Sequence, residues 1–286
     1  MKIGVIGTGL MGLPIALRIL EMGFKLTVYN RTTSKVEPLR EAGAIVAGTP
    51  QGLIAASDCI LLMLTHQEAI ESVLFRAEFE SILSGKTIIS MGTISPTESK
   101  NIQKEILKAG GNYLEAPVLG SIPEAKSGTL QIMVGSTEAQ FKQWFHVLQP
   151  LGEPKYIGEV GSASALKLAL NQLIASLTTA FALSLNFVQG QGVDIELFME
   201  ILRKSALYAP TFDKKLQRML EENYQNPNFP TKHLLKDTNL FLQEAATMGL
   251  NASSLEGVRA ILEKTQKLGK SNDDYSALFT AIKKES

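Results

Sequence analysis

The sequence predicts an α/β fold in which a parallel sheet is followed by an all-α domain. In the first half, short β-rich runs alternate with helical stretches, which is typical of repeated βαβ units. From Ser162 onward the strand signals vanish, and every segment has the apolar spacing of a helix. The expected strands are Lys2–Gly7, Lys25–Tyr29, Ile45–Ala47, Cys59–Leu64, Thr87–Ser90, Asn112–Ala116 and Leu130–Val134.

Two domains are expected, because a chain of 286 residues exceeds the usual size of one. We place them at residues 1–160 and 161–286, joined by a long interdomain helix. Helices between the strands are expected at Met11–Met22 and Pro96–Ala109, among others. In the second domain, the residues expected to break the helical pattern are Gly190, Gly192, Pro210, Pro227, Pro230 and Gly249.

The charge balance points to small-molecule partners. Lys and Arg number 28, as do Asp and Glu, which gives no basic face for nucleic acid or a membrane. The single cysteine, Cys59, lies in an apolar run and is expected to be a buried thiol. One cysteine excludes an internal disulfide and suits a reducing compartment, so we expect a cytoplasmic protein.

The uncharged stretch Leu168–Val193 is long enough to cross a bilayer, which takes about 20 residues. Polar residues interrupt it, and no second stretch of this kind accompanies it. We therefore interpret it as a helix buried on all sides within the protein rather than as a membrane anchor.

A glycine-rich turn follows the first expected strand and opens the first helix, with the sequence Gly7-Thr8-Gly9-Leu10-Met11-Gly12. This G-x-G-x-x-G spacing between strand and helix is the dinucleotide-binding fingerprint of Rossmann-type domains. Gly7 permits the tight turn, Gly9 lets the backbone approach a pyrophosphate, and Gly12 allows close helix packing. We assign the whole turn to cofactor binding, together with Met63 and Leu64 at the end of a later strand.

The end of the second strand favours NADP over NAD. An NAD enzyme usually carries Asp or Glu there to bind the ribose hydroxyls. This chain has Asn30-Arg31-Thr32 instead, with Lys35 nearby. A guanidinium can bind the 2′-phosphate of NADP with paired hydrogen bonds, so these residues are assigned to the cofactor. The alternative is that Arg31 only faces solvent and Asn30 binds an unphosphorylated ribose.

Lys167 and Asn171 are the first candidates for catalytic residues. They are four residues apart at the start of an otherwise uncharged helix, so they project from one face. A lone lysine there is expensive to bury without a purpose, and burial favours a pKa suited to proton transfer. The alternative is a lysine at the helix start that extends its ammonium to solvent.

Five spaced segments together resemble the β-hydroxyacid dehydrogenase family, and within it the branch that reduces glyoxylate and succinic semialdehyde. The resemblance covers nearly the whole chain and implies a Rossmann-type domain followed by a helical one. The segments, in order along the chain, are Gly7–Gly12, Gly92–Pro96, Glu115–Ser121, Gly158–Asn171 and Phe229–Asp237.

The resemblance also implies roles for single residues. Lys167 would be the catalytic acid or base and Asn171 an orienting group. Thr93 and Lys236 would contact the cofactor. The substrate side would be formed by Gly120, Ser121, Phe229 and Asp237.

One departure from the family concerns the substrate loop. Leu119 stands where the family usually has a serine that binds the substrate carboxylate. The backbone N–H groups of Gly120 and Ser121 are expected to form the anion-binding site that remains. The implied reaction is hydride transfer from NADPH to the carbonyl carbon of a small carboxylate-bearing aldehyde, with Lys167 giving the proton.

Two other functions stay open. One is an NAD(P)-dependent dehydrogenase of the 3-hydroxyisobutyrate or tartronate semialdehyde type, and the other is a noncatalytic NADP-binding module. Lys167 argues against the imine-reducing branch, which usually replaces this lysine. No metal site is expected, because His66, His146 and His233 are scattered. The resemblance implies a homodimer or homotetramer.

Overall fold

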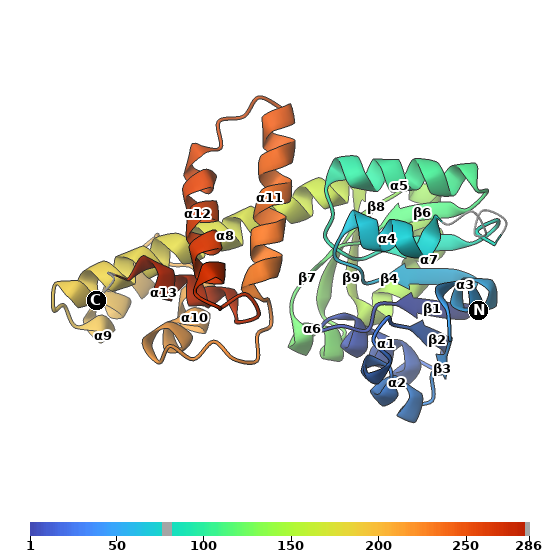
Figure 1. Cartoon of the computed structure of the whole chain (residues 1–286), viewed down its shortest axis with the longest axis horizontal. Helices are drawn as coiled ribbons and strands as arrows, with labels where there is room; N and C mark the ends of the chain where they lie inside the picture. The colour runs from blue at the N-terminus through green and yellow to red at the C-terminus, as the bar shows by residue number, and fades with distance from the viewer. Residues whose placement is uncertain (76–81, 284–286) are drawn as a thin grey trace. The chain divides into compact units, whose positions relative to one another are not determined.

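A computed structural model describes residues 1–75 and 82–283 of the chain. It divides into two compact units, Met1–Leu168 and Ala169–Ser286. Figure 1 labels the helices and strands of both units. Helix α8 (Ser162–Gly190) runs through the boundary, so its first turns belong to the N-terminal unit and the rest to the C-terminal unit.

The N-terminal unit is built on one sheet with strand order β3-β2-β1-β4-β5-β6-β8-β7, in which β9 also pairs with β8. β1, β2, β4 and β5 are parallel to their neighbours, as expected from βαβ units. The strands are β1 (Lys2–Ile6), β2 (Lys25–Tyr29), β3 (Ile45–Val46), β4 (Cys59–Leu62), β5 (Thr87–Ser90), β6 (Asn112–Glu115), β7 (Val118–Leu119), β8 (Leu130–Gly135) and β9 (Gly152–Gly158).

The far edge of the sheet differs from the predicted all-parallel arrangement. β8 runs antiparallel to β6 and β7, because the chain between β6 and β8 forms β7 and a six-residue helix instead of the long crossover that a parallel neighbour needs. Neither β7 nor β9 was expected. β7 has two residues, and β9 contains Gly152 and Pro154, which are unfavourable in strand interiors.

Helices cover both faces of this sheet (Figure 1). Alternate strand residues face opposite sides, so Val5 and Leu61 belong to one apolar core while Ile6 and Leu62 belong to the other. Cys59 is a buried thiol, as predicted. The helices are α1 (Gly12–Glu21), α2 (Glu37–Glu41), α3 (Pro50–Ala56), α4 (Gln67–Leu74), α5 (Pro96–Lys108), α6 (Ile122–Ser127) and α7 (Glu138–Leu148), with short 3₁₀ turns at Thr33–Lys35 and Gln149–Leu151.

The C-terminal unit is helical in its described residues, as the sequence predicted. Its helices pack around a core in which the rings of Phe181 and Phe212 stack with centroids 4.7 Å apart. After α8 come α9 (Ile195–Arg203), α10 (Pro210–Leu220), α11 (Thr231–Thr247), α12 (Ser253–Lys267) and α13 (Leu278–Ile282), with a 3₁₀ turn at Tyr275–Ala277. The predicted breaks fall at helix ends or between helices: α8 ends at Gly190, and Pro210 is the first residue of α10.

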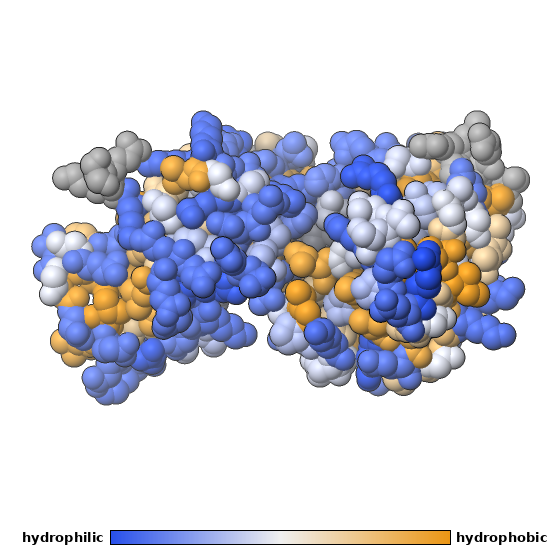
Figure 2. All heavy atoms as spheres, turned by 60° about the horizontal axis from the view of Figure 1, so that its bottom comes forward, coloured by the Kyte–Doolittle hydropathy of each residue, from blue (hydrophilic) through white to orange (hydrophobic). Residues whose placement is uncertain are grey.

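The prediction that α8 is buried on all sides is wrong for the single chain. The helix is long and apolar enough to cross a membrane, but 44% of its most apolar window is buried in the chain. Phe181 and Leu185 face the core, whereas Leu183 and Phe187 on the other side are 59% and 66% exposed. A helix that packs against other helices on one side buries only the side chains on that side. Figure 2 shows a group of hydrophobic atoms at the surface of the C-terminal unit, at the left of the view.

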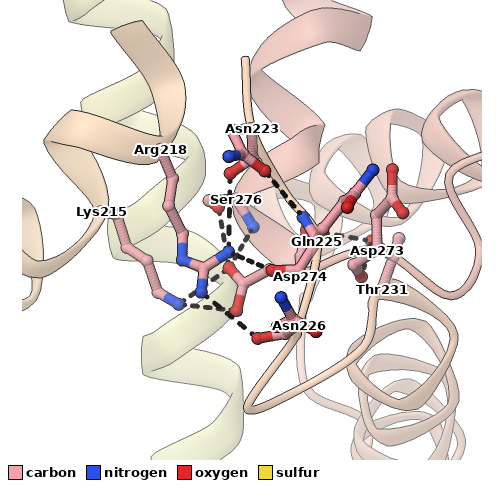
Figure 3. A network of polar contacts seen from close by, with 9 residues as sticks. All are labelled: Lys215, Arg218, Asn223, Gln225, Asn226, Thr231, Asp273, Asp274 and Ser276. Carbon is pink, nitrogen blue, oxygen red and sulfur yellow. Dashed lines mark hydrogen bonds and ion pairs between the residues drawn. The ribbon is translucent and has the colours of Figure 1, made fainter. Parts of the chain in front are cut away.

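A buried ion pair fixes the start of α11. The Lys215 ammonium on α10 donates to both carboxylate oxygens of Asp274, at 2.8 and 2.9 Å (Figure 3). Arg218, one turn along α10, donates to the Gln225 carbonyl at 2.8 Å and so holds the loop that follows this helix. Thr231, the first residue of α11, donates its backbone N–H to the carbonyl of Asp273. These contacts fix the position at which α11 begins within the segment Phe229–Asp237.

Candidate active site

The glycine-rich turn has the geometry that a dinucleotide requires. β1 ends at Ile6 and α1 begins at Gly12, with Gly7 in the left-handed region at φ +96°. A Cβ on Gly12 would lie 1.9 Å from the Gly7 carbonyl oxygen, whereas a Cβ on Gly9 would meet nothing within 4 Å. Because α1 has no side-chain cap, its first N–H groups and the open space at Gly9 suit an anionic ligand.

Asn30 has a structural role that sequence reasoning missed. Its Oδ1 accepts the Thr8 backbone N–H at 3.1 Å, and its Nδ2 donates to the Thr32 carbonyl at 3.0 Å. The Thr8 hydroxyl in turn donates to the Lys35 carbonyl at 3.0 Å. The Asn30 amide therefore ties the end of β2 to the glycine turn. Arg31, Thr32 and Lys35 are exposed beside it.

Met63, Leu64 and Thr93 lie at the same edge of the sheet. A Cβ on Gly7 would be 2.6 Å from the Met63 carbonyl oxygen, so this carbonyl packs directly against the turn. A Cβ on Gly92 would be 1.9 Å from the Leu64 carbonyl oxygen, which places Thr93 next to Leu64 in the loop after β5. These residues follow the carboxyl ends of β4 and β5, the edge at which α/β sheets bind ligands.

The predicted substrate loop is occupied by an internal carboxylate. Gly120 has φ +132° and leads into α6. The Glu124 carboxylate accepts both the backbone N–H and the hydroxyl of Ser121 at 2.7 Å. The predicted anion-binding N–H of Ser121 is thus already engaged in this conformation. Leu119 pairs with Gln131 across the β7–β8 ladder.

Lys167 lies in the second turn of α8 and is 9% exposed. Asn171 follows one turn later on the same continuous helix, as predicted. The alternative in which Lys167 extends to solvent is disfavoured by this burial. The carboxylate of Glu115, which the sequence did not single out as functional, accepts backbone N–H groups from the start of the same helix.

In the C-terminal unit, Asn171, Lys236 and Asp237 meet between α8 and α11. The Asn171 amide nitrogen donates to Asp237 Oδ2 at 2.6 Å, and the Lys236 ammonium lies 2.6 Å from Asp237 Oδ1. The buried Asn171 Oδ1 accepts no hydrogen bond from the residues that the structure describes. Phe229 packs edge-on against Tyr275, with ring centroids 5.8 Å apart.

The predicted residues thus form two groups. The N-terminal unit brings together the glycine turn, Asn30–Lys35 and the Met63–Thr93 edge, and the C-terminal unit brings together Asn171, Lys236 and Asp237. Residues 1–75 and 82–283 contain no cluster of three or more His, Cys, Asp or Glu side chains able to hold a metal. A glycine turn between the first strand of a largely parallel sheet and a helix without a side-chain cap defines a dinucleotide-binding fold.

Known families match both halves of the chain. Residues 2–161 match the family described as the NAD binding domain of 6-phosphogluconate dehydrogenase. Residues 161–282 match the one described as NAD-binding of NADP-dependent 3-hydroxyisobutyrate dehydrogenase.

Relatives match over the full length. The chain is 33% identical to glyoxylate/succinic semialdehyde reductase 1 of Arabidopsis thaliana, over 99% of both chains. It is 33% identical to 2-hydroxy-3-oxopropionate reductase of Escherichia coli K12, over 99% of this chain and 97% of the relative. The structure of Mycobacterium tuberculosis 3-hydroxyisobutyrate dehydrogenase with L-serine has a TM-score of 0.89 at 20% identity, over 99% of both chains.

The chain therefore belongs to the β-hydroxyacid dehydrogenase family, as its five motifs predicted. It is an NAD(P)-dependent oxidoreductase that acts on CH–OH groups.

Proposed function

We propose that this chain uses NADPH to reduce a small carboxylate-bearing aldehyde, such as glyoxylate or succinic semialdehyde, with Lys167 as the general acid. The observation that carries the proposal is the buried lysine one turn before Asn171 on α8, in a chain of this family. The Arabidopsis relative is named for both substrates.

The N-terminal unit fits a dinucleotide, because the space at Gly9 is open and the start of α1 lacks a side-chain cap. NADPH, when bound, supplies the hydride for the carbonyl carbon. The glycine turn would hold the pyrophosphate, and Met63, Leu64, Thr93 and Lys236 would contact the cofactor. The exposed Arg31 guanidinium, with Thr32 and Lys35 beside it, would bind the 2′-phosphate. Because both ends of the Asn30 amide serve the fold, Arg31 is the better candidate for selectivity.

Lys167 would hold the proton that the carbonyl oxygen receives, and Asn171 would orient the reacting groups. Because the Asn171 amide nitrogen already donates to Asp237, its Oδ1 is the atom left to accept a hydrogen bond. The Lys236 ammonium contacts Asp237 Oδ1, so the Asp237 carboxylate is held from both sides and fixes the Asn171 amide in one orientation. Phe229 would line the substrate side.

The substrate loop adds a selectivity element. Glu124 occupies the Ser121 donors, so a substrate carboxylate would compete with a carboxylate of the chain for them. With Leu119 in place of a serine, the Gly120 N–H is the remaining donor that we assign to the substrate. We therefore expect weaker binding of carboxylate substrates than the loop would allow without Glu124.

The main test measures turnover with NADPH and NADH across glyoxylate, succinic semialdehyde, tartronate semialdehyde and an uncharged aldehyde of similar size. We expect NADPH to be preferred at least tenfold, since a hydrogen bond to a charged group contributes about 1.5–3 kcal/mol. Lys167→Ala should lower kcat roughly a hundredfold or more, the scale of general acid catalysis, with NADPH binding nearly unchanged. Wild-type turnover by this variant would overturn the role of Lys167.

The loop is tested by Glu124→Gln. Removing the charge should lower KM for glyoxylate several-fold, because repulsion between two carboxylates at the Ser121 donors is relieved. KM for the uncharged aldehyde should stay the same. The matched control is Glu98→Gln, since Glu98 accepts the Ser95 backbone N–H at 2.7 Å in the equivalent capping box of α5. Equal KM values for glyoxylate in wild type and Glu124→Gln would show that the loop does not bind the substrate carboxylate.

A second candidate is a tartronate semialdehyde type reductase, because the Escherichia coli relative has the same 33% identity. The aldehyde panel separates it from the first by the substrate with the highest kcat/KM. A noncatalytic NADP-binding module would turn over none of the aldehydes.

We propose that the chain assembles with copies of itself in the cytoplasm. The exposed apolar residues on α8 and α9, among them Leu183, Phe187, Leu197 and Ile201, support a homodimer or homotetramer. An apolar face needs no charge complement, so a second copy can cover it through a symmetric contact. The molar mass in solution tests this. The single buried cysteine, Cys59, supports a cytoplasmic enzyme.

A further inference from the structure

Glu115 is a buried carboxylate, 1% exposed, at the end of β6. Its Oε1 accepts the backbone N–H groups of Gly161 and Ala163 at 2.8 Å and of Ser164 at 3.1 Å. Its Oε2 accepts the Ser164 hydroxyl at 2.6 Å. These donors form the start of α8, where the helix leaves N–H groups without partners of their own. One side chain of the sheet therefore holds the first turn of the helix that carries Lys167.

The same carboxylate is held from a third element. The Ser99 hydroxyl on α5 donates to Oε2 at 2.5 Å, and the Ser99 oxygen lies 2.9 Å from the Tyr113 hydroxyl. Both oxygens of Glu115 are thus engaged, from α5 on one side and α8 on the other. A buried charge with fixed partners on several elements has one low-energy position.

Two glycines make room for this contact. Gly135 on β8 pairs with Glu115 across the sheet, and a Cβ there would lie 2.3 Å from Oε1. Gly161 has φ +102°, a conformation that L side chains rarely adopt, where it directs its N–H to the carboxylate. The absence of a side chain at Gly135 therefore leaves space for the Glu115 carboxylate, and the backbone at Gly161 points its N–H toward this carboxylate.

Lys167 follows Ser164 by three residues, so it lies about one helical turn beyond the last donor to Glu115. A shift or rotation of the first turn would move the ammonium with it. A misplacement of about 1 Å in a reacting group can cost on the order of a hundredfold in rate. We propose that Glu115 is a positioning residue: it fixes the axial position and the rotation of the first turn of α8, and thereby the position of the Lys167 ammonium. This proposal rests on the proposed role of Lys167.

The experiment uses full-length Glu115→Gln with NADPH and the best substrate of the aldehyde panel. We expect kcat to fall at least tenfold, while KM and the NADPH affinity, measured by fluorescence titration, stay within twofold of wild type. The control is Asp194→Asn, because Asp194 caps α9 through the Leu197 N–H at 2.8 Å and this helix carries none of the predicted site residues. It should leave kcat unchanged.

A double-mutant cycle separates positioning from general structural damage. If Glu115 acts through Lys167, Glu115→Gln should have no further effect on the residual rate of Lys167→Ala. The same fold-loss in both backgrounds would overturn the proposal, as would a lower Tm of Glu115→Gln with an unchanged kcat. If Glu115→Gln does not fold, Ser164→Ala replaces it, with an expected loss of about threefold in kcat and none in KM. Wild-type turnover by Lys167→Ala alone would instead refute the proposed function.

Discussion

Two buried carboxylates hold the helices that carry the predicted site, and they are stabilised in different ways. Glu115 in the N-terminal unit receives five hydrogen bonds from described residues, all from neutral N–H and hydroxyl groups. Asp274 in the C-terminal unit is 0% exposed and receives the Lys215 ammonium as well as the N–H and hydroxyl of Ser276 (Figure 3). We call these two carboxylates the N-terminal and the C-terminal anchor. The N-terminal anchor is stabilised by the N–H groups at the start of α8, and the C-terminal anchor by the positive charge of Lys215.

The difference predicts how each anchor responds to mutation. The positive charge at a helix start is spread over several backbone groups, which no single substitution removes. An ion pair depends on two side chains, and losing one leaves an uncompensated buried charge on the other. We therefore expect the C-terminal anchor to matter more for stability, and the N-terminal anchor to matter more for the placement of Lys167.

The largest expected effect is that of Lys215→Ala, which should lower the free energy of unfolding by about 3–5 kcal/mol. The cause is the Asp274 carboxylate left without its cation at 2.8 Å. Urea unfolding at neutral pH measures the change, and Ser276→Ala is the matched control, expected to cost about 1–2 kcal/mol. A loss for Lys215→Ala no greater than that of its control would mean that the ion pair does not stabilise this unit.

Glu115→Gln sharpens the same comparison, because its amide oxygen can still accept the N–H groups of α8, whereas its NH2 group cannot accept the hydroxyl protons of Ser99 and Ser164. Glu115→Gln should lower the free energy of unfolding less than Lys215→Ala does. It should lower kcat more than Lys215→Ala does. The reverse order would remove the distinction between the two anchors.

A smaller effect is expected from Tyr275, whose ring lies 4.2 Å from the Lys215 ammonium. Burial raises the pKa of Tyr275 from its ordinary value of 10.0 to about 12. Between these values the unfolded chain loses the phenol proton first, so stability should fall as pH rises from 10 to 12. The slope is at most about 1.4 kcal/mol per pH unit.

Tyr275→Phe keeps the ring and should remove this alkaline loss of stability. Burial lowers the pKa of Lys215, which acts in the opposite direction below its ordinary value of 10.5, but the ammonium is present in both proteins. The difference between wild type and variant therefore isolates the phenol. Parallel unfolding free energies for the two proteins from pH 10 to 12 would show that Tyr275 keeps an ordinary pKa.

Sequence reasoning found features that depend on neighbouring residues. The glycine turn is recognisable because its strand, turn and helix are contiguous, and Lys167 is conspicuous as a lone charge in an apolar helix. It missed Glu115 and Asp274, whose contacts with the start of α8 and with Lys215 span 46 to 49 and 59 residues of the chain. It also missed that Glu124 takes the donors of Ser121, although the spacing of Ser121 and Glu124 is the sequence signature of a capping box.

The sequence by itself determined the alternation of strands and helices up to β6, the glycine turn and the helix that carries Lys167 and Asn171, because these follow from local spacing and backbone freedom. Only the tertiary structure decided that β8 runs antiparallel, that α8 leaves an apolar face exposed, and that Asn30 serves the fold. The reason is that pairing, burial and hydrogen bonding are properties of two groups brought together. Which groups meet is set by the packing of the whole chain.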